Sequence, residues 1–173
     1  ALDAGAQVTL ISAARGLPLP VGAELVPVDT ARDMLAAVEA AITDCDVLIM
    51  AAAVADFRPA TVASQKIKKR EDGDEALSIP MARNPDILLA VKAHREQSGA
   101  PRVVVGFAAE STDLLANARR KLARKGLDLL VANDITATDA GFAADTNRVV
   151  ILDAQGGEQP VALSSKSYVS ELI

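Results

Sequence analysis

Short apolar segments alternate along this chain with longer segments in which apolar residues recur at helical spacing. Residues 47–52 form a continuous apolar run, which is typical of a strand at the centre of a sheet. Thr30 and Asp33 have capping-box spacing just before a helical apolar face. This alternation predicts an α/β fold with a doubly wound, mostly parallel, Rossmann-like sheet. We expect strands at 7–12, 24–28, 47–52, 102–108 and 128–132, helices from 30, at 84–97 and at 112–125, a C-terminal β-hairpin of strands 147–153 and 159–163, and a short helix within 164–173.

The composition fits one ordinary domain, so residues 1–173 are interpreted as a single domain. Half of the residues are hydrophobic and only 2% are aromatic, so the core must consist of Ala, Val, Leu and Ile. The net charge of −5 argues against a general nucleic-acid binder. Cys45 is the single cysteine, and no apolar run reaches the length of a membrane span. We therefore expect a cytoplasmic protein that binds neither nucleic acid nor a membrane.

The chain opens on a pattern that normally closes a helix. Residues 1–6 read as a last helical turn in which Gly5 takes the left-handed position that follows a helix. A strand is predicted directly afterwards. We therefore expect that the first strand, loop and helix of the sheet precede Ala1 and that the domain is truncated at its N-terminus.

Several classes of enzyme lack the residues that they need. A nucleophilic triad requires a histidine base, but His94 is the single histidine and falls in the middle of a predicted helix. Cys45 is interpreted as a small buried hydrophobic residue. No G-x-G-x-x-G motif is present, which weakens an NADP-dependent Rossmann oxidoreductase as an alternative. That alternative stays open because the first loop is expected upstream, and so does a nucleotide-binding module without catalysis.

Ligands of doubly wound sheets bind beyond the carboxyl ends of the strands, which makes the residues after each strand the first site candidates. Asp56 follows the predicted central strand and either caps a turn or faces a ribose hydroxyl or a phosphate-bound Mg²⁺. Asn84 is the predicted N-cap of the next helix, with Pro85 at its first position and Asp86 in its first turn. The segments at predicted strand ends are 12–15, 53–58, 107–110 and 133–134.

A basic run lies in the long segment 55–80, which we interpret as a crossover loop or a flexible hairpin. The run contains Lys66, Lys68 and Lys69 and continues to Arg70. Such runs are usually solvated. Because this one begins near the predicted ligand edge, it is also a candidate lid that would neutralise phosphate charge and exclude water.

Two lysines border the apolar stripe of predicted helix 112–125, which Gly126 closes. Lys121 and Lys125 fall at one edge of this stripe, four residues apart, and Leu115 is expected within it. The lysines either extend to solvent near the negative end of the helix dipole or form an anion-binding pair. Their spacing leaves both interpretations open.

Six motifs occur in one order along nearly the whole chain, and together they closely resemble the bacterial phosphopantothenoylcysteine synthetase domain. They are residues 51–59 (AAAVADFRP), 66–69 (KIKK), 84–88 (NPDIL), 106–110 (GFAAE), 121–126 (KLARKG) and 131–135 (VANDI). No single motif is decisive, whereas the ordered set is highly specific.

The resemblance implies a phosphopantothenate–cysteine ligase that uses CTP in two steps. CTP activates the carboxylate of 4′-phosphopantothenate as an acyl-cytidylate, and the amine of cysteine then displaces CMP to form the amide. The family's domain uses Mg²⁺ with the triphosphate, forms a homodimer with active sites at the subunit interface, and is usually fused to a flavin (FMN) decarboxylase. The preference for CTP over ATP comes from the resemblance alone.

The resemblance also implies which residues contact the nucleotide. Lys66 would be catalytic and support acyl-cytidylate formation, and Asp56 would contact CTP and is the candidate for the metal. The remaining implied contacts are Pro85, Asp86, Ile87, Leu88, Phe107, Lys121 and Lys125, with Ala51, Ala52 and Asn133 as secondary candidates. Ser111 departs from the family's usual threonine. The family's glycine-rich phosphate loop and an asparagine linked to the acyl-cytidylate would lie upstream of Ala1.

Overall fold

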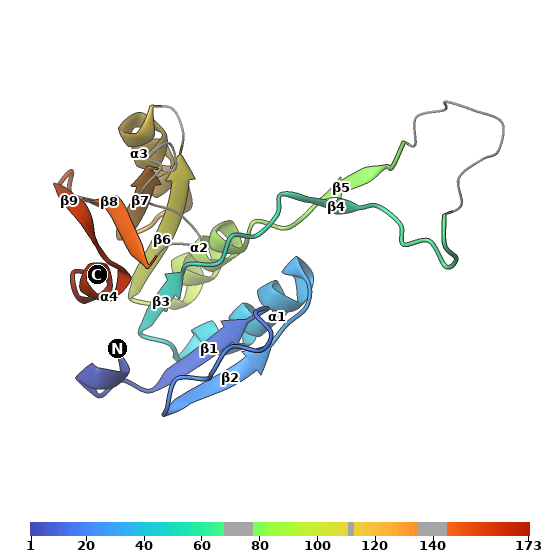
Figure 1. Ribbon diagram of the computed structural model, residues 1–173, viewed down its shortest axis with the longest axis horizontal. Coiled ribbons are helices and arrows are strands. Elements are labelled where there is room, and N and C mark those ends of the chain that lie inside the picture. Colours follow the sequence, from blue (N-terminus) through green and yellow to red (C-terminus); the bar gives the residue numbers. More distant parts are fainter. Residues whose placement is uncertain (68–77, 111–112, 135–144) are drawn as a thin grey trace. The chain divides into compact units, whose positions relative to one another are not determined.

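The computed structural model describes residues 1–67, 78–110, 113–134 and 145–173 (Figure 1). The chain forms two compact units. The first unit consists of Ala1–Leu35 and Ala53–Asp86. The second consists of Ala36–Ala52 and Ile87–Ile173 and holds the larger sheet.

The first unit contains two small sheets of two strands each. A 3₁₀ turn, η1 (Leu2–Ala4), ends at Gly5, whose φ of 80° is the left-handed conformation predicted for it. The strands β1 (Val8–Ser12) and β2 (Ala23–Pro27) pair in parallel. The strands β4 (Phe57–Pro59) and β5 (Met81–Arg83) pair antiparallel, so part of segment 55–80 forms the base of a hairpin, as one of the two interpretations predicted.

The helix α1 (Ala31–Ala41) begins with the predicted capping box. The backbone N–H of Asp33 donates to Thr30 Oγ1 at 3.1 Å, and the backbone N–H of Thr30 donates to Asp33 Oδ2 at 2.9 Å. The Thr30 hydroxyl donates to the same carboxylate oxygen at 2.8 Å. These hydrogen bonds lower the pKa of Asp33 because they stabilise its charged form, the side-chain bond from Thr30 most of all. The reciprocal bonds confirm the helix start that the sequence predicts.

The second unit is built on a five-stranded sheet in the order β3-β6-β7-β8-β9. The strands β3, β6 and β7 are parallel, whereas β8 and β9 run antiparallel to their neighbours. This mostly parallel arrangement and the β8–β9 hairpin confirm the predicted α/β class. The strands are β3 (Val47–Met50), β6 (Val103–Glu110), β7 (Leu129–Asp134), β8 (Thr146–Asp153) and β9 (Glu158–Ser165), and a 3₁₀ turn, η2 (Ile42–Asp44), precedes β3.

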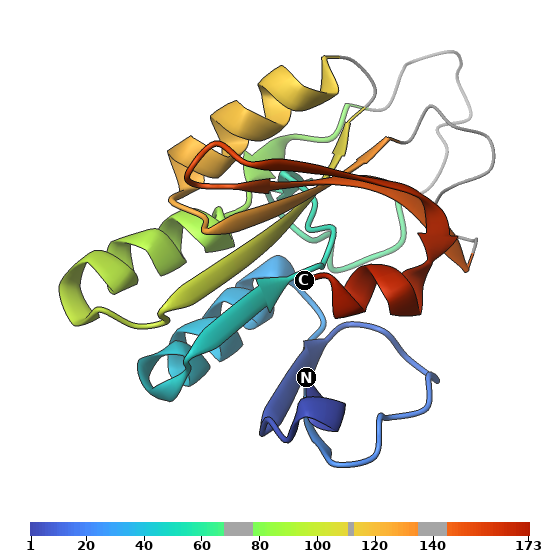
Figure 2. The same ribbon diagram turned by 90° about the vertical axis from the view of Figure 1, so that its left-hand side faces the viewer.

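Helices cover the two faces of this sheet (Figure 2). The helix α4 (Lys166–Glu171) contributes Val169 to an apolar cluster on one face, and α3 (Leu114–Lys125) contacts β6, β7 and β8. The helix α2 (Ile87–Ser98) approaches β6 at Gly106, where an added Cβ would lie 3.6 Å from Leu88 Cδ1. The cluster beneath α4 consists of Val105, Val131, Val149, Ile151, Val161 and Val169.

Three local predictions are wrong. β3 stands at one end of the strand order rather than at its centre, and Val47 and Ile49 are each 49% exposed. Leu115 is 40% exposed rather than part of the buried stripe of α3, which is formed by Ala118 and Leu122. The third is the start of α2, which begins at Ile87 rather than at Asn84. Among the described residues, none of the helices is long and apolar enough to cross a bilayer.

Candidate functional site at the carboxyl edge of the sheet

The carboxyl ends of β3, β6 and β7 meet at one edge of the second unit. The register aligns Met50 with Gly106 of β6 and Gly106 with Leu130 of β7, so β3 ends where its neighbours continue. Ala51 and Ala52 follow β3 at this edge, and both are exposed. A parallel sheet presents its ligand site beyond such strand ends. The structure therefore places these two candidates where the fold favours a ligand.

Phe107 and Asn133 lie on one face of the sheet close to this edge. Phe107 pairs with Val131, and Ala109 pairs with Asn133, which puts Phe107 and Asn133 on diagonal positions of neighbouring strands. The ring of Phe107 packs against the apolar cluster beneath α4 and is half-buried. The structure thus brings together two of the predicted residues, an aromatic ring and an amide.

Lys121 and Lys125 occupy a different part of the second unit. α3 follows β6, starts at the carboxyl edge and returns along the sheet toward the start of β7. At 1.5 Å per residue, Lys121 lies roughly 10 Å along the axis from the first residue of α3, and Lys125 is its last residue. Both are half-buried, which agrees with their predicted place beside the apolar stripe. Their contact with CTP stays a prediction.

The start of α2 differs from the prediction. The helix begins at Ile87, and Asn84 is not its N-cap. Asn84 Nδ2 instead donates to the carbonyl of Ala55 at 2.8 Å, and its Oδ1 accepts from Arg58 at 3.2 Å. Asn84 therefore ties the base of the β4–β5 hairpin, and Pro85 and Asp86 precede the helix.

Ile87 and Leu88 are core residues, with 3% and 6% of their surface exposed. Their side chains are not available to a polar ligand. The start of a helix carries the positive end of its dipole, which favours an anion. A nucleotide contact of Ile87 and Leu88 stays a prediction and would have to use their backbone groups.

Asp56 and Lys66 belong to the first unit, and both are exposed. The carbonyl of Asp56 accepts from the backbone N–H of Asn84 at 2.8 Å, which fixes the backbone at this aspartate. The basic run beyond Ile67 (Lys68, Lys69 and Arg70) lies outside the described residues, and so does Ser111.

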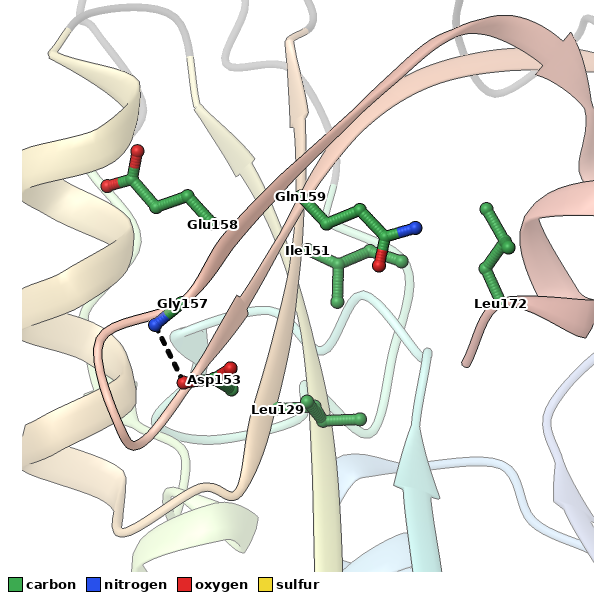
Figure 3. A pocket seen from close by; sticks show the side chains of 7 residues that line it. All are labelled: Leu129, Ile151, Asp153, Gly157, Glu158, Gln159 and Leu172. Atoms are coloured by element: carbon green, nitrogen blue, oxygen red, sulfur yellow. Dashed lines mark hydrogen bonds between the residues drawn. The ribbon is translucent and has the colours of Figure 1, made fainter.

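A hollow of about 260 Å³ opens at the other end of the second unit (Figure 3). It is smaller than a typical small-molecule site of roughly 300–1,000 Å³ and contains none of the predicted residues. At its rim Asp153 Oδ1 accepts from the backbone N–H groups of Gln155 and Gly157, both at 2.8 Å, so this carboxylate shapes the β8–β9 turn. The hollow is lined by Leu129, Ile151, Asp153, Gly157, Glu158, Gln159 and Leu172.

Among the described residues, no group of three or more His, Cys, Asp or Glu side chains is placed to hold a metal ion. Asp56 therefore stands as a single carboxylate in the part of the chain that the structure describes. Mg²⁺ is often bound through one or two carboxylates together with substrate phosphates and waters. An exposed aspartate fits that mode.

One polar residue at this edge, Asn147, is not among the predicted residues. Asn147, Val149 and Ile151 are two residues apart on β8 and therefore face the same side of the sheet. Val149 and Ile151 are buried in the cluster beneath α4. The Oδ1 of Asn147 is buried without a hydrogen-bond partner, and so is the Oδ1 of Asn133. A polar residue at an inward position of a strand with alternating burial was the signal that could have identified it.

The fold and the edge residues define an α/β domain with a mostly parallel sheet whose candidate site lies at the strand ends. Residues 1–173 match the family described as "DNA/pantothenate metabolism flavoprotein C-terminal domain". The chain belongs to this family.

Similar proteins carry names from one pathway. The chain is 45% identical over 170 residues to the coenzyme A biosynthesis bifunctional protein CoaBC of Vibrio vulnificus (strain CMCP6), covering 98% of this chain and 41% of that protein. It is 43% identical over 171 residues to the protein of the same name from Bacillus subtilis (strain 168), covering 98% and 40%. The chain thus spans about two fifths of the length of these relatives.

The crystal structure of the C-terminal domain of a coenzyme A biosynthesis bifunctional protein CoaBC superimposes with a TM-score of 0.77. The sequence identity is 30%, and the match covers 99% of this chain and 72% of that one. This likeness agrees with the α/β fold described above.

Proposed function

We propose that this domain ligates cysteine to 4′-phosphopantothenate with CTP as the activating co-substrate. The observation that carries the proposal is the match of all 173 residues to the pantothenate-metabolism family, with relatives named for coenzyme A biosynthesis at 40–45% identity. The chain's motifs support the finer statement, since the ordered set of them resembles the synthetase domain of that pathway.

The proposed reaction consists of two displacements. A carboxylate oxygen of 4′-phosphopantothenate attacks the α-phosphorus of CTP, the P–O bond to the β-phosphate breaks, and pyrophosphate leaves. The neutral amine of cysteine then attacks the acyl carbon, loses a proton, and expels CMP as the C–O bond breaks. Activation of the acyl group divides a difficult amide synthesis into two easier steps.

Positive groups carry the first step because negative charge develops on the phosphates as pyrophosphate leaves. We assign Lys66 to the α-phosphate as the catalytic cation, and Lys121 and Lys125 to other nucleotide contacts. Positioned cations of this kind stabilise transition-state charge without reorganising. The start of α2 adds the positive end of a helix dipole as a further anion contact.

Asp56 is the residue that would hold Mg²⁺ against the triphosphate. Its exposed carboxylate supplies the hard oxygen ligand that this cation requires, and the phosphate oxygens would supply others. When bound, the cation neutralises part of the triphosphate charge.

The family resemblance also suggests the partners of this domain, a second copy of the chain and a decarboxylase. We propose a cytoplasmic homodimer in which the domain is fused to an FMN-dependent decarboxylase. The names of the relatives support the fusion, since they describe bifunctional proteins of which this chain covers about two fifths.

The proposal is tested with the full-length protein, Mg²⁺, 4′-phosphopantothenate and CTP. Pyrophosphate should be released without cysteine and rise when cysteine is added, with CMP and the amide appearing together. Omission of 4′-phosphopantothenate is the control and should abolish release. If no pyrophosphate forms with all substrates present, the proposed function is wrong.

A further inference from the structure

The backbone on both sides of Asp56 is held by one residue, Asn84. The carbonyl of Asp56 accepts from the backbone N–H of Asn84 at 2.8 Å, one step beyond the antiparallel pair of Phe57 with Arg83. The carbonyl of Ala55 accepts from Asn84 Nδ2, also at 2.8 Å. These two carbonyls belong to the peptide planes before and after the Cα of Asp56. Because each peptide is planar, holding both planes limits φ and ψ of Asp56 and so the direction in which its side chain leaves the backbone.

The side chain of Asp56 has no comparable anchor. Its carboxylate is exposed, and among the described residues none donates a hydrogen bond to it or forms an ion pair with it. The position of the carboxylate therefore depends on the backbone that carries it. A group that binds a ligand must be held within a narrow range of positions by residues that are themselves fixed.

Arg58 determines which way the amide of Asn84 points. Arg58 Nη1 donates to Asn84 Oδ1 at 3.2 Å and also donates to the carbonyl of Arg83. A guanidinium can only donate and a carbonyl can only accept, so the amide must turn its oxygen toward Arg58 and its nitrogen toward Ala55. Arg58 and Asn84 are both half-buried, which limits replacement of these bonds by water. Loss of the amide would free the peptide plane before Asp56, whereas the plane after it would keep its backbone bond.

We propose that Asn84 is a positioning residue that holds Asp56 where its carboxylate binds Mg²⁺ beside the triphosphate. The inference rests on the proposed function, in which Asp56 holds that cation, and it adds the residue through which the carboxylate is placed. Groups that orient a metal ligand without touching the metal typically contribute roughly ten- to a hundredfold to metal affinity. A clamp that served the hairpin alone would change stability and leave the dependence of CTP binding on Mg²⁺ as it is.

The experiment titrates the full-length protein with CTP in the presence of Mg²⁺ and again in EDTA. Asn84→Ala removes both side-chain bonds, and Asn84→Leu does so at similar volume; both keep the backbone N–H that bonds Asp56. Asp56→Ala removes the metal ligand itself, and the double variant Asp56→Ala/Asn84→Ala completes a cycle. Thr30→Ala is the control, because it removes cap hydrogen bonds of α1 and none of those around Asp56. The titrations are made below the unfolding midpoint of every variant, measured without ligand.

In Mg²⁺ the wild type and Thr30→Ala should bind CTP equally. Asn84→Ala, Asn84→Leu and Asp56→Ala should each bind CTP about tenfold more weakly. In EDTA the two Asn84 variants should bind CTP as the wild type does. The double variant should bind no more weakly than Asp56→Ala in Mg²⁺, because Asn84 acts through that carboxylate.

Three results would overturn the inference. The first is unchanged affinity in both Asn84 variants, and the second is an equal loss in Mg²⁺ and in EDTA, which would mark Asn84 as a structural residue or a direct nucleotide contact. The third is a loss at Asn84 that adds in full to the loss at Asp56 in the double variant. A wild-type affinity that does not depend on Mg²⁺ would also overturn it. Because binding is measured apart from turnover, a wild type that binds CTP with Mg²⁺ and releases no pyrophosphate would refute the proposed function alone.

Discussion

The ion pair between Arg95 and Asp128 offers a quantitative test of what holds α2 against the sheet. The guanidinium of Arg95 donates to the carbonyls of Gly126 and Arg102 at 3.2 and 2.6 Å, and its Nη1 lies 2.9 Å from Asp128 Oδ2. Asp128 Oδ2 in turn accepts from the backbone N–H of Val104 at 2.7 Å. One side chain of α2 thus joins the segments that lead into β6 and β7.

Replacing Arg95 with Met keeps much of the aliphatic packing and removes every donor. The side chains of Arg95 and Asp128 are only 26% and 35% exposed, so water replaces the lost contacts incompletely. Loss of a partly buried charged partner should lower the free energy of unfolding by about 2–3 kcal/mol. For a domain of this size that corresponds to a decrease of roughly 5–10 °C in the unfolding midpoint.

Arg102→Met is the matched control. Arg102 pairs with Asp46 through side chains that are 76% and 73% exposed, and exposed pairs contribute at most about 1 kcal/mol. Urea denaturation followed by circular dichroism should separate the two variants. A double-mutant cycle with Asp128→Asn, which retains an acceptor for Val104, isolates the coupling to Arg95. If Arg95→Met is no more destabilising than Arg102→Met, the reasoning from burial and geometry is refuted.

Three further predictions concern catalysis, the α1 cap and the sheet. Lys66→Gln should slow pyrophosphate release more than it weakens CTP binding, measured by rapid quench and by titration; near-normal acyl-cytidylate formation would contradict its role. Thr30→Ala should lower the unfolding midpoint at pH 7 and have a smaller effect at pH 3. The hydrogen bonds with Thr30 lower the pKa of Asp33 in the folded protein below its ordinary value of 3.8. Their contribution to the stability of the folded state is therefore complete above pH 3.8 and is lost as the pH falls through the pKa of the folded state. An equal loss of stability at both pH values would argue against this linkage. Gly106→Ala should destabilise by about 1–3 kcal/mol in urea, because a Cβ there would lie 2.7 Å from Leu127 Cδ1; an unchanged midpoint would show that Leu127 moves aside without cost.

Local signals in the sequence predicted the features that depend on neighbouring residues. The capping box of Thr30 and Asp33 forms as expected, and Gly126 ends α3 in the left-handed conformation with φ of 62°. The β8–β9 hairpin also occupies the predicted segments. Each of these depends on groups a few residues apart, which a sequence pattern can register.

The wrong predictions depend on contacts between distant segments. Asn84 resembles an N-cap by its neighbours, but its side chain bonds Ala55 and Arg58, which lie more than 25 residues earlier in the chain. The apolar run of β3 indicated burial, whereas its place in the sheet follows from strand order, which the run does not encode.

Predictions for the candidate site also succeed or fail according to whether they depend on neighbouring residues or on contacts between distant strands. The rule that ligands bind at carboxyl ends pointed to Phe107 and Asn133, and the structure places both near that edge on neighbouring strands. Asn147 was missed because its relation to Asn133 arises from the antiparallel register of β7 and β8. Ile87 and Leu88 were named as contacts although their side chains are buried, since a motif match does not distinguish backbone from side-chain contacts.

The central claim, ligation through an acyl-cytidylate, is tested most directly by isotope transfer. 4′-Phosphopantothenate labelled with ¹⁸O in its carboxylate is incubated with CTP, cysteine and the full-length protein, and the CMP is examined by mass spectrometry. Attack of the carboxylate on the α-phosphorus predicts one ¹⁸O atom in each CMP formed. CMP that carries no ¹⁸O while the amide accumulates would contradict the mechanism.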